Sequence, residues 1–145
     1  MKKRIHAMAG GIGFVMIIVF WISTAISELF ANHETTAAVK TLILQGMFVL
    51  IPAMVIVGGS GMAMGRRRKD APARAKKKRM PIIAMNGLLI LVPAAWFLAG
   101  KADAGDFDST FYAVQAVELV AGAVNLTMMG LNIRDGFKMT GRMPR

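Results

Sequence analysis

The sequence contains no cysteine, which removes a whole group of chemistries from consideration. Disulfides, thiolate zinc sites, iron–sulfur clusters and thiol redox reactions all need that side chain. Histidine is nearly as scarce, since His6 and His33 are the only two in the chain. Any directly bound metal ion would therefore have to be held by histidine, methionine, aspartate or glutamate.

Acidic residues are also few, and the balance of charge is strongly basic. The 145 residues include 18 lysines and arginines against 8 aspartates and glutamates, a formal net charge of +10, while 55% of the residues are hydrophobic. In a soluble domain, so much apolar surface would need a large core and so much charge a large wet surface. A membrane protein resolves this conflict by separating the two kinds of residue along the chain.

Four apolar segments are long enough to cross a bilayer as helices, because a hydrocarbon core of about 30 Å needs about 20 helical residues. We predict a single all-α domain over residues 1–145, a polytopic four-helix up-down membrane bundle. The expected elements are helices over about 5–30, 40–64, 80–100 and 108–133, and a basic loop over 65–79.

Local signals mark the ends of these segments. The first segment follows a basic stretch like that of a signal peptide, but it exceeds the usual length of about 7–15 apolar residues, so we interpret it as a retained anchor helix. Pro81 is expected in the first turn of the third helix, where its missing N–H costs nothing. Asp108 or Ser109 is expected to cap the fourth helix.

The basic residues gather on one side of the predicted bundle. Sixteen of the eighteen lysines and arginines lie in the N-terminal segment, the middle connection and the C-terminal segment, which share that side. The other side has Lys40 and Lys101, together with acidic residues such as Glu34 and Asp106. Because cytoplasmic segments of inner-membrane proteins are rich in lysine and arginine, we expect both termini and the basic loop in the cytoplasm of a bacterium.

This basic surface predicts anionic lipids as partners at the cytoplasmic face, at about 1 kcal/mol per cation near the membrane surface. Nucleic acid is not expected, because membrane topology already explains the charges and no aromatic residues are interleaved with them. The remaining expected partner is protein, either a second copy of the chain or another membrane protein.

Two predicted helices share a pattern of spacing. It relates Gln45, Pro52 and Gly59 to Asn86, Pro93 and Gly100. The pattern is either an inverted repeat, as found around transporter binding sites, or the ordinary recurrence of these residue types in membrane helices. In both cases each proline removes a backbone hydrogen bond and is expected to kink its helix.

Ionisable and polar residues near the outer ends of the spans form the first candidate site. Glu28, Lys40, Gln115 and Glu118 fall at similar depths, and Gln115 shares a helix face with Glu118. A charge inside a span costs about 2.5–3.5 kcal/mol, so such residues are usually functional. Two interpretations stay open: a proton-linked or cation-binding pocket, or a polar clamp between helices with Lys40 extending to the membrane surface.

The second candidate site lies at the inner start of the first span, in the stretch Arg4-Ile5-His6-Ala7-Met8-Ala9-Gly10. This R-x-H-x-x-x-G pattern resembles the first helix of PepSY-associated and cytochrome b561-like membrane proteins. The resemblance implies haem b as a cofactor, with His6 as an iron ligand and with Gly10 and Gly13 leaving room for the porphyrin. The alternative is an interfacial histidine in a basic segment.

One chain cannot ligate one haem with both histidines. His33 lies at the opposite end of the span, about 40 Å away at 1.5 Å per helical residue, and is itself expected in a loop. The second ligand would be absent, would come from a second copy, or would be a methionine at the inner depth. The methionines at that depth are Met85, Met128 and Met129.

Residues 111–126 and 130–136 resemble small four-span transmembrane proteins of proteobacteria, a resemblance that implies no activity. The sequence has no nucleophile paired with a base, no metal-binding motif and no phosphate-binding loop, so we assign no catalytic residue and no metal ligand. We predict a non-enzymatic accessory or assembly component of a membrane complex. The alternatives are a b-type haem electron carrier with His6 as axial ligand and a subunit of a small proton-linked transporter.

Overall fold

The computed structural model describes residues 2–66 and 70–144, which form helices and no strand. Its elements are α1 (Lys2–Phe30), α2 (His33–Gly65), α3 (Ala71–Asn86), the π-helical turn η1 (Gly87–Leu91), α4 (Val92–Asp103) and α5 (Ser109–Met139). Some predicted basic groups fall outside the described part, namely Arg67, Arg68, Lys69, Arg145 and the side chain of Lys2.

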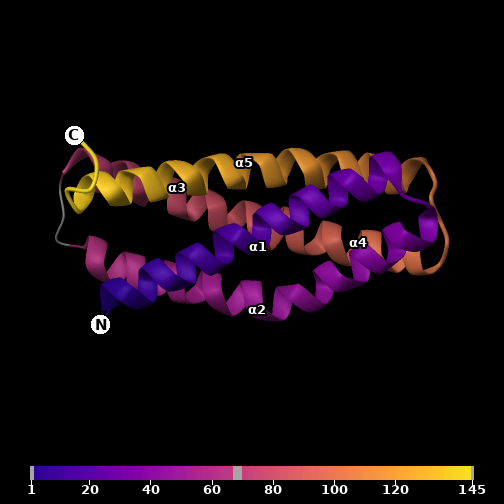
Figure 1. Ribbon diagram of the computed structural model, residues 1–145, viewed down its shortest axis with the longest axis horizontal. Helices are drawn as coiled ribbons and strands as arrows, with labels where there is room; N and C mark the ends of the chain where they lie inside the picture. Colours follow the sequence, from indigo (N-terminus) through magenta and orange to yellow (C-terminus); the bar gives the residue numbers. More distant parts are fainter. Residues whose placement is uncertain (1, 67–69, 145) are drawn as a thin grey trace.

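The chain crosses the bundle four times in alternating directions (Figure 1). The third crossing is made by α3, η1 and α4 in succession. One end of the bundle, here called the basic end, holds the start of α1, the end of α2, the start of α3 and the end of α5. The other end, here called the acidic end, holds the short connections before α2 and before α5. Among the described residues, four crossings are long and apolar enough to span a membrane, which confirms the all-helical class and the presence of four such helices.

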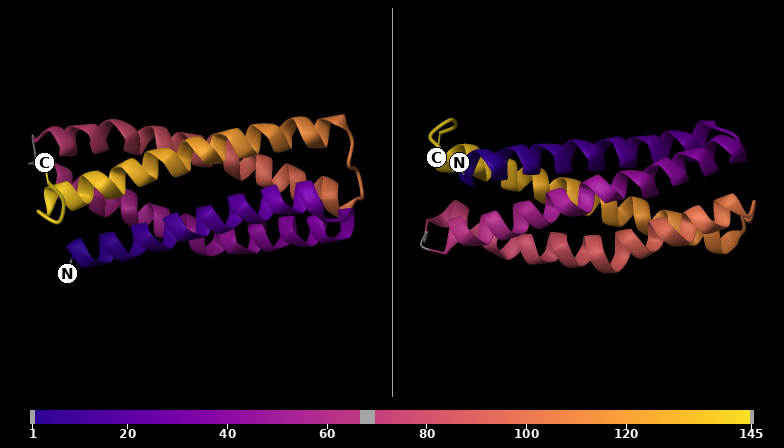
Figure 2. Two further views of the ribbon diagram at one scale, coloured as in Figure 1. Left: turned by 45° about the horizontal axis from the view of Figure 1, so that its top comes forward. Right: turned by 90° about the horizontal axis from the view of Figure 1, so that it is seen from below.

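The four crossings are arranged as a square. α1 packs against α2 and α5, and the third crossing packs against the same two helices. Among the described residues, no Cα atom of α2 comes within 8 Å of one in α5, and none in α1 comes that close to the third crossing. Two views turned from that of Figure 1 show the same arrangement (Figure 2). Thus α2 and α5 face each other across a diagonal of the bundle.

The third crossing begins at Ala71 rather than at about residue 80, so residues 71–79 are helical and the predicted basic loop over 65–79 is much shorter. The proline of the first turn is Pro72, whereas Pro81 lies inside α3. Lysine and arginine are good helix formers, so a basic segment can extend an apolar helix into water. The second helix likewise starts early, at His33, which is therefore not a loop residue.

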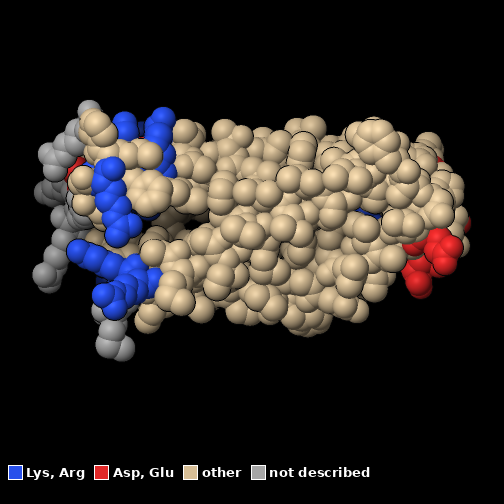
Figure 3. All heavy atoms as spheres, viewed as in Figure 1, with Lys and Arg blue, Asp and Glu red and all other residues tan. Residues whose placement is uncertain are grey.

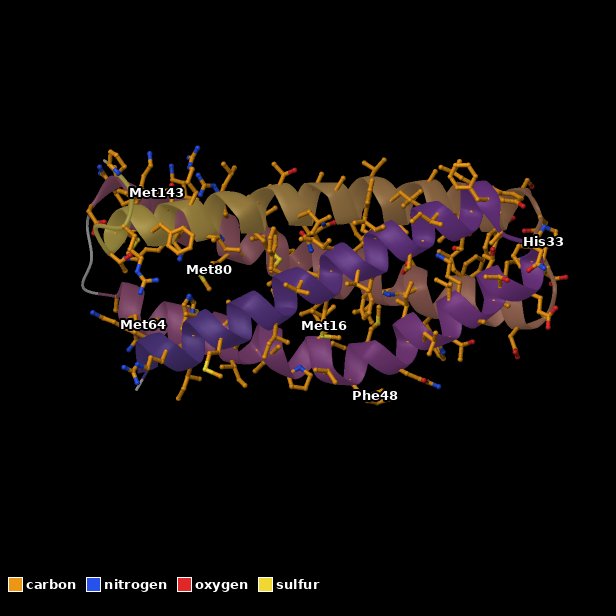
Figure 4. The ribbon with its side chains drawn as sticks, in the orientation of Figure 1. Met16, His33, Phe48, Met64, Met80 and Met143 are labelled. Carbon is orange, nitrogen blue, oxygen red and sulfur yellow. The ribbon has the colours of Figure 1, made fainter. Side chains whose placement is uncertain are left out.

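The two mid-helix prolines are accommodated differently. Before Pro93 the helix widens into η1, where the backbone N–H of Val92 donates to the carbonyl of Gly87. Pro52 lies within α2 without a π-helical turn before it, and α2 instead changes direction near Phe48 (Figure 4). The two segments that share a sequence pattern therefore differ in local structure.

The interior of the bundle is narrow and its exterior is apolar. One buried cluster joins Ile17, Ile83 and Met129 across three crossings, and a second near the acidic end includes Leu98 and Phe111. Many large apolar side chains point outward instead. On the face drawn in Figure 3, lysine and arginine gather at one end, aspartate and glutamate gather at the other, and a broad band of other residues lies between.

Candidate functional site

The predicted outer residues meet inside the bundle at its acidic end. Glu28 lies in the last turn of α1, Lys40 lies in the second turn of α2, and Gln115 and Glu118 lie in the first turns of α5. Side-chain caps fix the first residues of α2 and α5, and thereby the positions of these side chains along the bundle. The side chain of Asn32 accepts a hydrogen bond from the backbone N–H of Thr35 at the start of α2, and Asp108 caps α5 as predicted, accepting from the N–H of Phe111.

Lys40 and Glu118 form a buried ion pair across the diagonal. The Lys40 Nζ lies 2.7 Å from Glu118 Oε2, and the Lys40 side chain is 1% exposed. Gln115 Nε2 donates to the same oxygen at 3.0 Å. Because the backbones of α2 and α5 are not in contact, the long lysine side chain bridges the interior between them. The expectation that Lys40 extends to the membrane surface is therefore wrong.

Glu28 shares this cluster without taking part in its hydrogen bonds. Its carboxyl group lies within electrostatic range of Lys40, Glu118 and His33. Its Oε1 atom is buried and receives no hydrogen bond from any described group, and the same holds for Gln115 Oε1. The arrangement leaves two buried acceptors without donors, which is costly in an apolar setting.

The neighbouring hydroxyl groups do not supply the missing donors. Thr24, Ser27 and Thr36 are each 3% exposed and line the same end of the bundle. The Ser27 hydroxyl donates to the carbonyl of Thr24, and that of Thr36 donates to the carbonyl of Ser27. Hydroxyl groups therefore line this end of the bundle, but those of Ser27 and Thr36 donate to backbone carbonyl groups.

An aromatic contact joins the start of α2 to the connection before α5, and an ion pair closes that connection. The ring of His33 stacks on Phe107 with centroids 3.9 Å apart, and His33 lies at the tip of the bundle (Figure 4). Lys101 Nζ lies 2.6 Å from Asp108 Oδ2. This hydrogen bond, followed by that from the Phe111 N–H, holds the pKa of Asp108 below its usual value.

The stretch predicted as a haem site, around His6, Gly10 and Gly13, packs against α2. Its Nδ1 atom lies 2.9 Å from the hydroxyl oxygen of Ser60 on α2. A Cβ atom on Gly10 would lie 3.8 Å from Val57, and one on Gly13 would lie 3.0 Å from the sulfur of Met54. Side chains of α2 therefore lie against both glycines, as in close packing between helices, and ligation of haem by His6 stays a prediction.

Sequence reasoning missed an ion pair near the basic end. Arg79 Nη1 lies 2.7 Å from Asp135 Oδ2 and also donates to Asn132 Oδ1 at 3.2 Å. The fourth span was expected to end at about residue 133, which would leave Asp135 in water, whereas α5 continues to Met139 and Asp135 is 4% exposed. The sequence signal that could have indicated this pair is Asp135, an acidic residue within the basic C-terminal segment, on the same side of the bundle as the basic residues around Arg79.

A pair of amides joins the third crossing to α5 between the two ends. Asn86 Nδ2 donates to Asn125 Oδ1 at 2.8 Å and to the carbonyl of Ala121 at 2.9 Å. Asn125 Nδ2 donates in turn to the carbonyl of Ile83. These hydrogen bonds clamp α3 to α5 just before η1 begins.

Comparison with known proteins yields no relative from which a role could be carried over. No protein-family model, curated protein or solved structure matches the chain.

Proposed function

We propose that the protein is a non-enzymatic component of a bacterial inner-membrane assembly, with its basic end in the cytoplasm. The separation of charge supports this orientation, because lysine and arginine at one end and acidic residues at the other follow the positive-inside rule (Figure 3). The apolar band between the ends supports contact with lipid and with other membrane helices. A basic end inside the cell also favours anionic lipids as its neighbours.

The observation that carries the proposal of assembly is the outward position of Gln45. This amide lies in the middle part of α2, is exposed, and forms no hydrogen bond with any described group. In contrast, Asn86, Asn125 and Gln115 all donate hydrogen bonds inside the bundle. An amide that faces lipid has no partner, so it favours contact with another helix that can pair with it.

An apolar groove continues the face of Gln45 toward the basic end. Small Ala9 and Ala53 lie among larger apolar residues of α1 and α2 along this groove. Phe48 and Val49, about one helical turn after Gln45, form part of its wall, and Phe48 projects away from the bundle (Figure 4). Small residues beside large ones allow a second helix to approach closely.

The occupant that fits this face best is a second copy of the chain. A glutamine amide carries both donors and an acceptor, so two copies of Gln45 related by a two-fold axis satisfy each other. The surrounding groove residues carry no charge that would repel an identical surface. We therefore propose that the assembly begins with a homodimer in which the two α2 helices face each other.

Disulfide cross-linking tests this dimer directly, because the natural chain has no cysteine. In membranes, Val49→Cys should give a covalent dimer on mild oxidation, since position 49 lies beside the proposed axis. Val120→Cys, at a valine on α5 that is at least as exposed, is the matched control and should remain monomeric. Gln45→Leu should weaken dimerisation roughly 3- to 30-fold, the equivalent of about 0.6–2 kcal/mol for an inter-helix hydrogen bond.

A monomer at all expression levels, or equal cross-linking at both positions, would contradict the proposed dimer. A cross-linked product whose mass differs from that of two chains would show that a different protein occupies the groove, and it would also overturn the assignment of a second copy.

A further inference from the structure

The orientation of the Gln115 amide is determined by its neighbour. An ionised Glu118 offers only acceptors, so Gln115 must direct its NH₂ group toward Glu118 Oε2. The amide oxygen then points away from the ion pair, buried and without a donor. Flipping the amide would place two oxygens against each other, so the free acceptor is a consequence of the ion pair.

The charges in the cluster do not balance. Glu28 and Glu118 supply two carboxyl groups, while Lys40 supplies one ammonium group that is already bound to Glu118. The free oxygen of Glu28 therefore lies in a buried setting with neither a hydrogen-bond donor nor its own counter-charge. One additional positive charge would neutralise the cluster and give its free acceptors a partner.

We propose that Glu28, Gln115 and the Lys40–Glu118 ion pair form a binding site for one monovalent cation. The cation is either a proton, bound to Glu28 Oε1 as a hydroxyl group, or an alkali-metal ion coordinated by that oxygen. A proton converts the free acceptor of Glu28 into a donor, whereas a metal ion gives that acceptor a coordinated partner. This site does not depend on the proposed dimer.

The position of Glu28 allows exchange with water beyond the acidic end. It lies in the last turn of α1 and its side chain is half-buried rather than enclosed. The charged and titratable groups that act on it are Lys40 and His33 of α2 and Glu118 of α5. A positive charge on His33 would oppose a cation at Glu28, so His33→Phe, which keeps an aromatic ring against Phe107, removes this influence.

Infrared spectroscopy of the full chain in lipid nanodiscs tests the proton. At neutral pH without alkali ions, we expect the C=O band of one protonated carboxyl group, present in the natural chain and in His33→Phe. The band should disappear in Glu28→Gln and persist in Glu34→Gln, whose side chain is exposed. Glu118→Gln should also remove it, because Lys40 is then left with Glu28 as the carboxylate in range.

Thermal unfolding with different chlorides tests the metal ion. If an alkali ion is bound, sodium or potassium should raise the unfolding temperature of the natural chain relative to N-methylglucamine, and Glu28→Gln should lose that response. The expected rise corresponds to a factor of about 100 in the unfolding constant at an ion concentration 100 times the dissociation constant.

A protonated carboxyl band assigned to Glu28 identifies the proton as the occupant, and an ion-specific stabilisation identifies the metal ion. If the natural chain shows neither, all its carboxyl groups are ionised without an added cation, and the proposed site is overturned. Both measurements use the natural chain, so the proposal stays testable even if Glu28→Gln fails to fold.

Discussion

At the scale of single residues, polar side chains decide which helices are joined. Lys40 reaches across the diagonal to Glu118, and Arg79 joins α3 to α5 through Asp135. Within a membrane there is little hydrophobic drive for helices to associate, so such pairs and close backbone packing carry the specificity of the bundle. Removing one partner of a buried ion pair typically costs about 3–5 kcal/mol, because the other charge is left alone.

Trp21 and Gly122 show the close packing between α1 and α5. The indole N–H of Trp21 donates to the carbonyl of Leu119 at 2.8 Å. A Cβ atom on Gly122 would lie 2.8 Å from the Trp21 ring. Gly122→Ala should therefore displace the indole, break this hydrogen bond and lower stability by about 1–3 kcal/mol, the usual range for overpacking.

This prediction is measured by thermal unfolding and by tryptophan emission in a Trp96→Phe background, which leaves Trp21 as the only tryptophan. Gly100→Ala is the matched control, because its new methyl group would meet nothing within 4 Å and should be neutral or stabilising by up to about 1 kcal/mol. Identical behaviour of the two variants would show that Gly122 does not mediate the contact.

At the scale of elements, the ends and interruptions of the helices have local causes. Asn32 and Asp108 cap α2 and α5 with side-chain oxygens, which satisfies backbone N–H groups that a helix start leaves free. In the third crossing, η1 changes the hydrogen-bond pattern just before Pro93, where the regular pattern would lack a donor. The amides of Asn86 and Asn125 brace the segment in which this change begins.

The cap of α5 should make stability depend on pH. The bond from Lys101 holds the pKa of folded Asp108 below its usual value, so the ionised group stabilises the folded state fully above that usual value. This contribution is lost as the pH falls through the lower folded pKa. Asp108→Asn, which keeps a capping oxygen without the charge, should be less stable than the natural chain at neutral pH and equal to it in acid.

Unfolding temperatures of both chains, recorded from neutral to strongly acidic pH, measure this difference. High salt should narrow the gap at neutral pH, because Asp108 is exposed and its ion pair is screened. A gap that stays constant down to the most acidic conditions would contradict the assignment to ionised Asp108.

At the scale of the whole molecule, the two ends differ in charge, and this difference predicts which side of a membrane each end faces. Helical residues 71–79 extend the basic end beyond the apolar part of α3, which places several lysines and arginines on a rigid element. At the acidic end, only short connections leave the bundle.

Cysteine labelling measures the proposed orientation. Arg74→Cys on α3 and Asp106→Cys in the connection before α5 both replace exposed residues of the cysteine-free chain. With a membrane-impermeant maleimide on intact spheroplasts, Asp106→Cys should react and Arg74→Cys should react only after lysis. The reverse pattern would place the basic end outside and contradict the proposed topology.

The sequence by itself determined the features that depend on local composition. The four apolar stretches, the positions of the charged residues and the cap at Asp108 can be read directly from the sequence, so the all-helical class and the number of long apolar helices were predictable. The residue at which the third crossing begins was not predictable, because a basic segment can form either a loop or a helix, depending on its capping and packing. The depth of Glu28, Lys40, Gln115 and Glu118 was also predictable from helix length.

Only the tertiary structure decided which way each side chain points. The rotation of a helix about its axis results from many weak contacts with its neighbours, and it turned Lys40 inward and Gln45 outward although both lie on α2. The same rotation set His6 against Ser60 and packed Val57 over Gly10, where a haem was considered. Those contacts join residues distant in sequence, so no local pattern specifies them, and they determine which polar groups are satisfied and which remain free to bind.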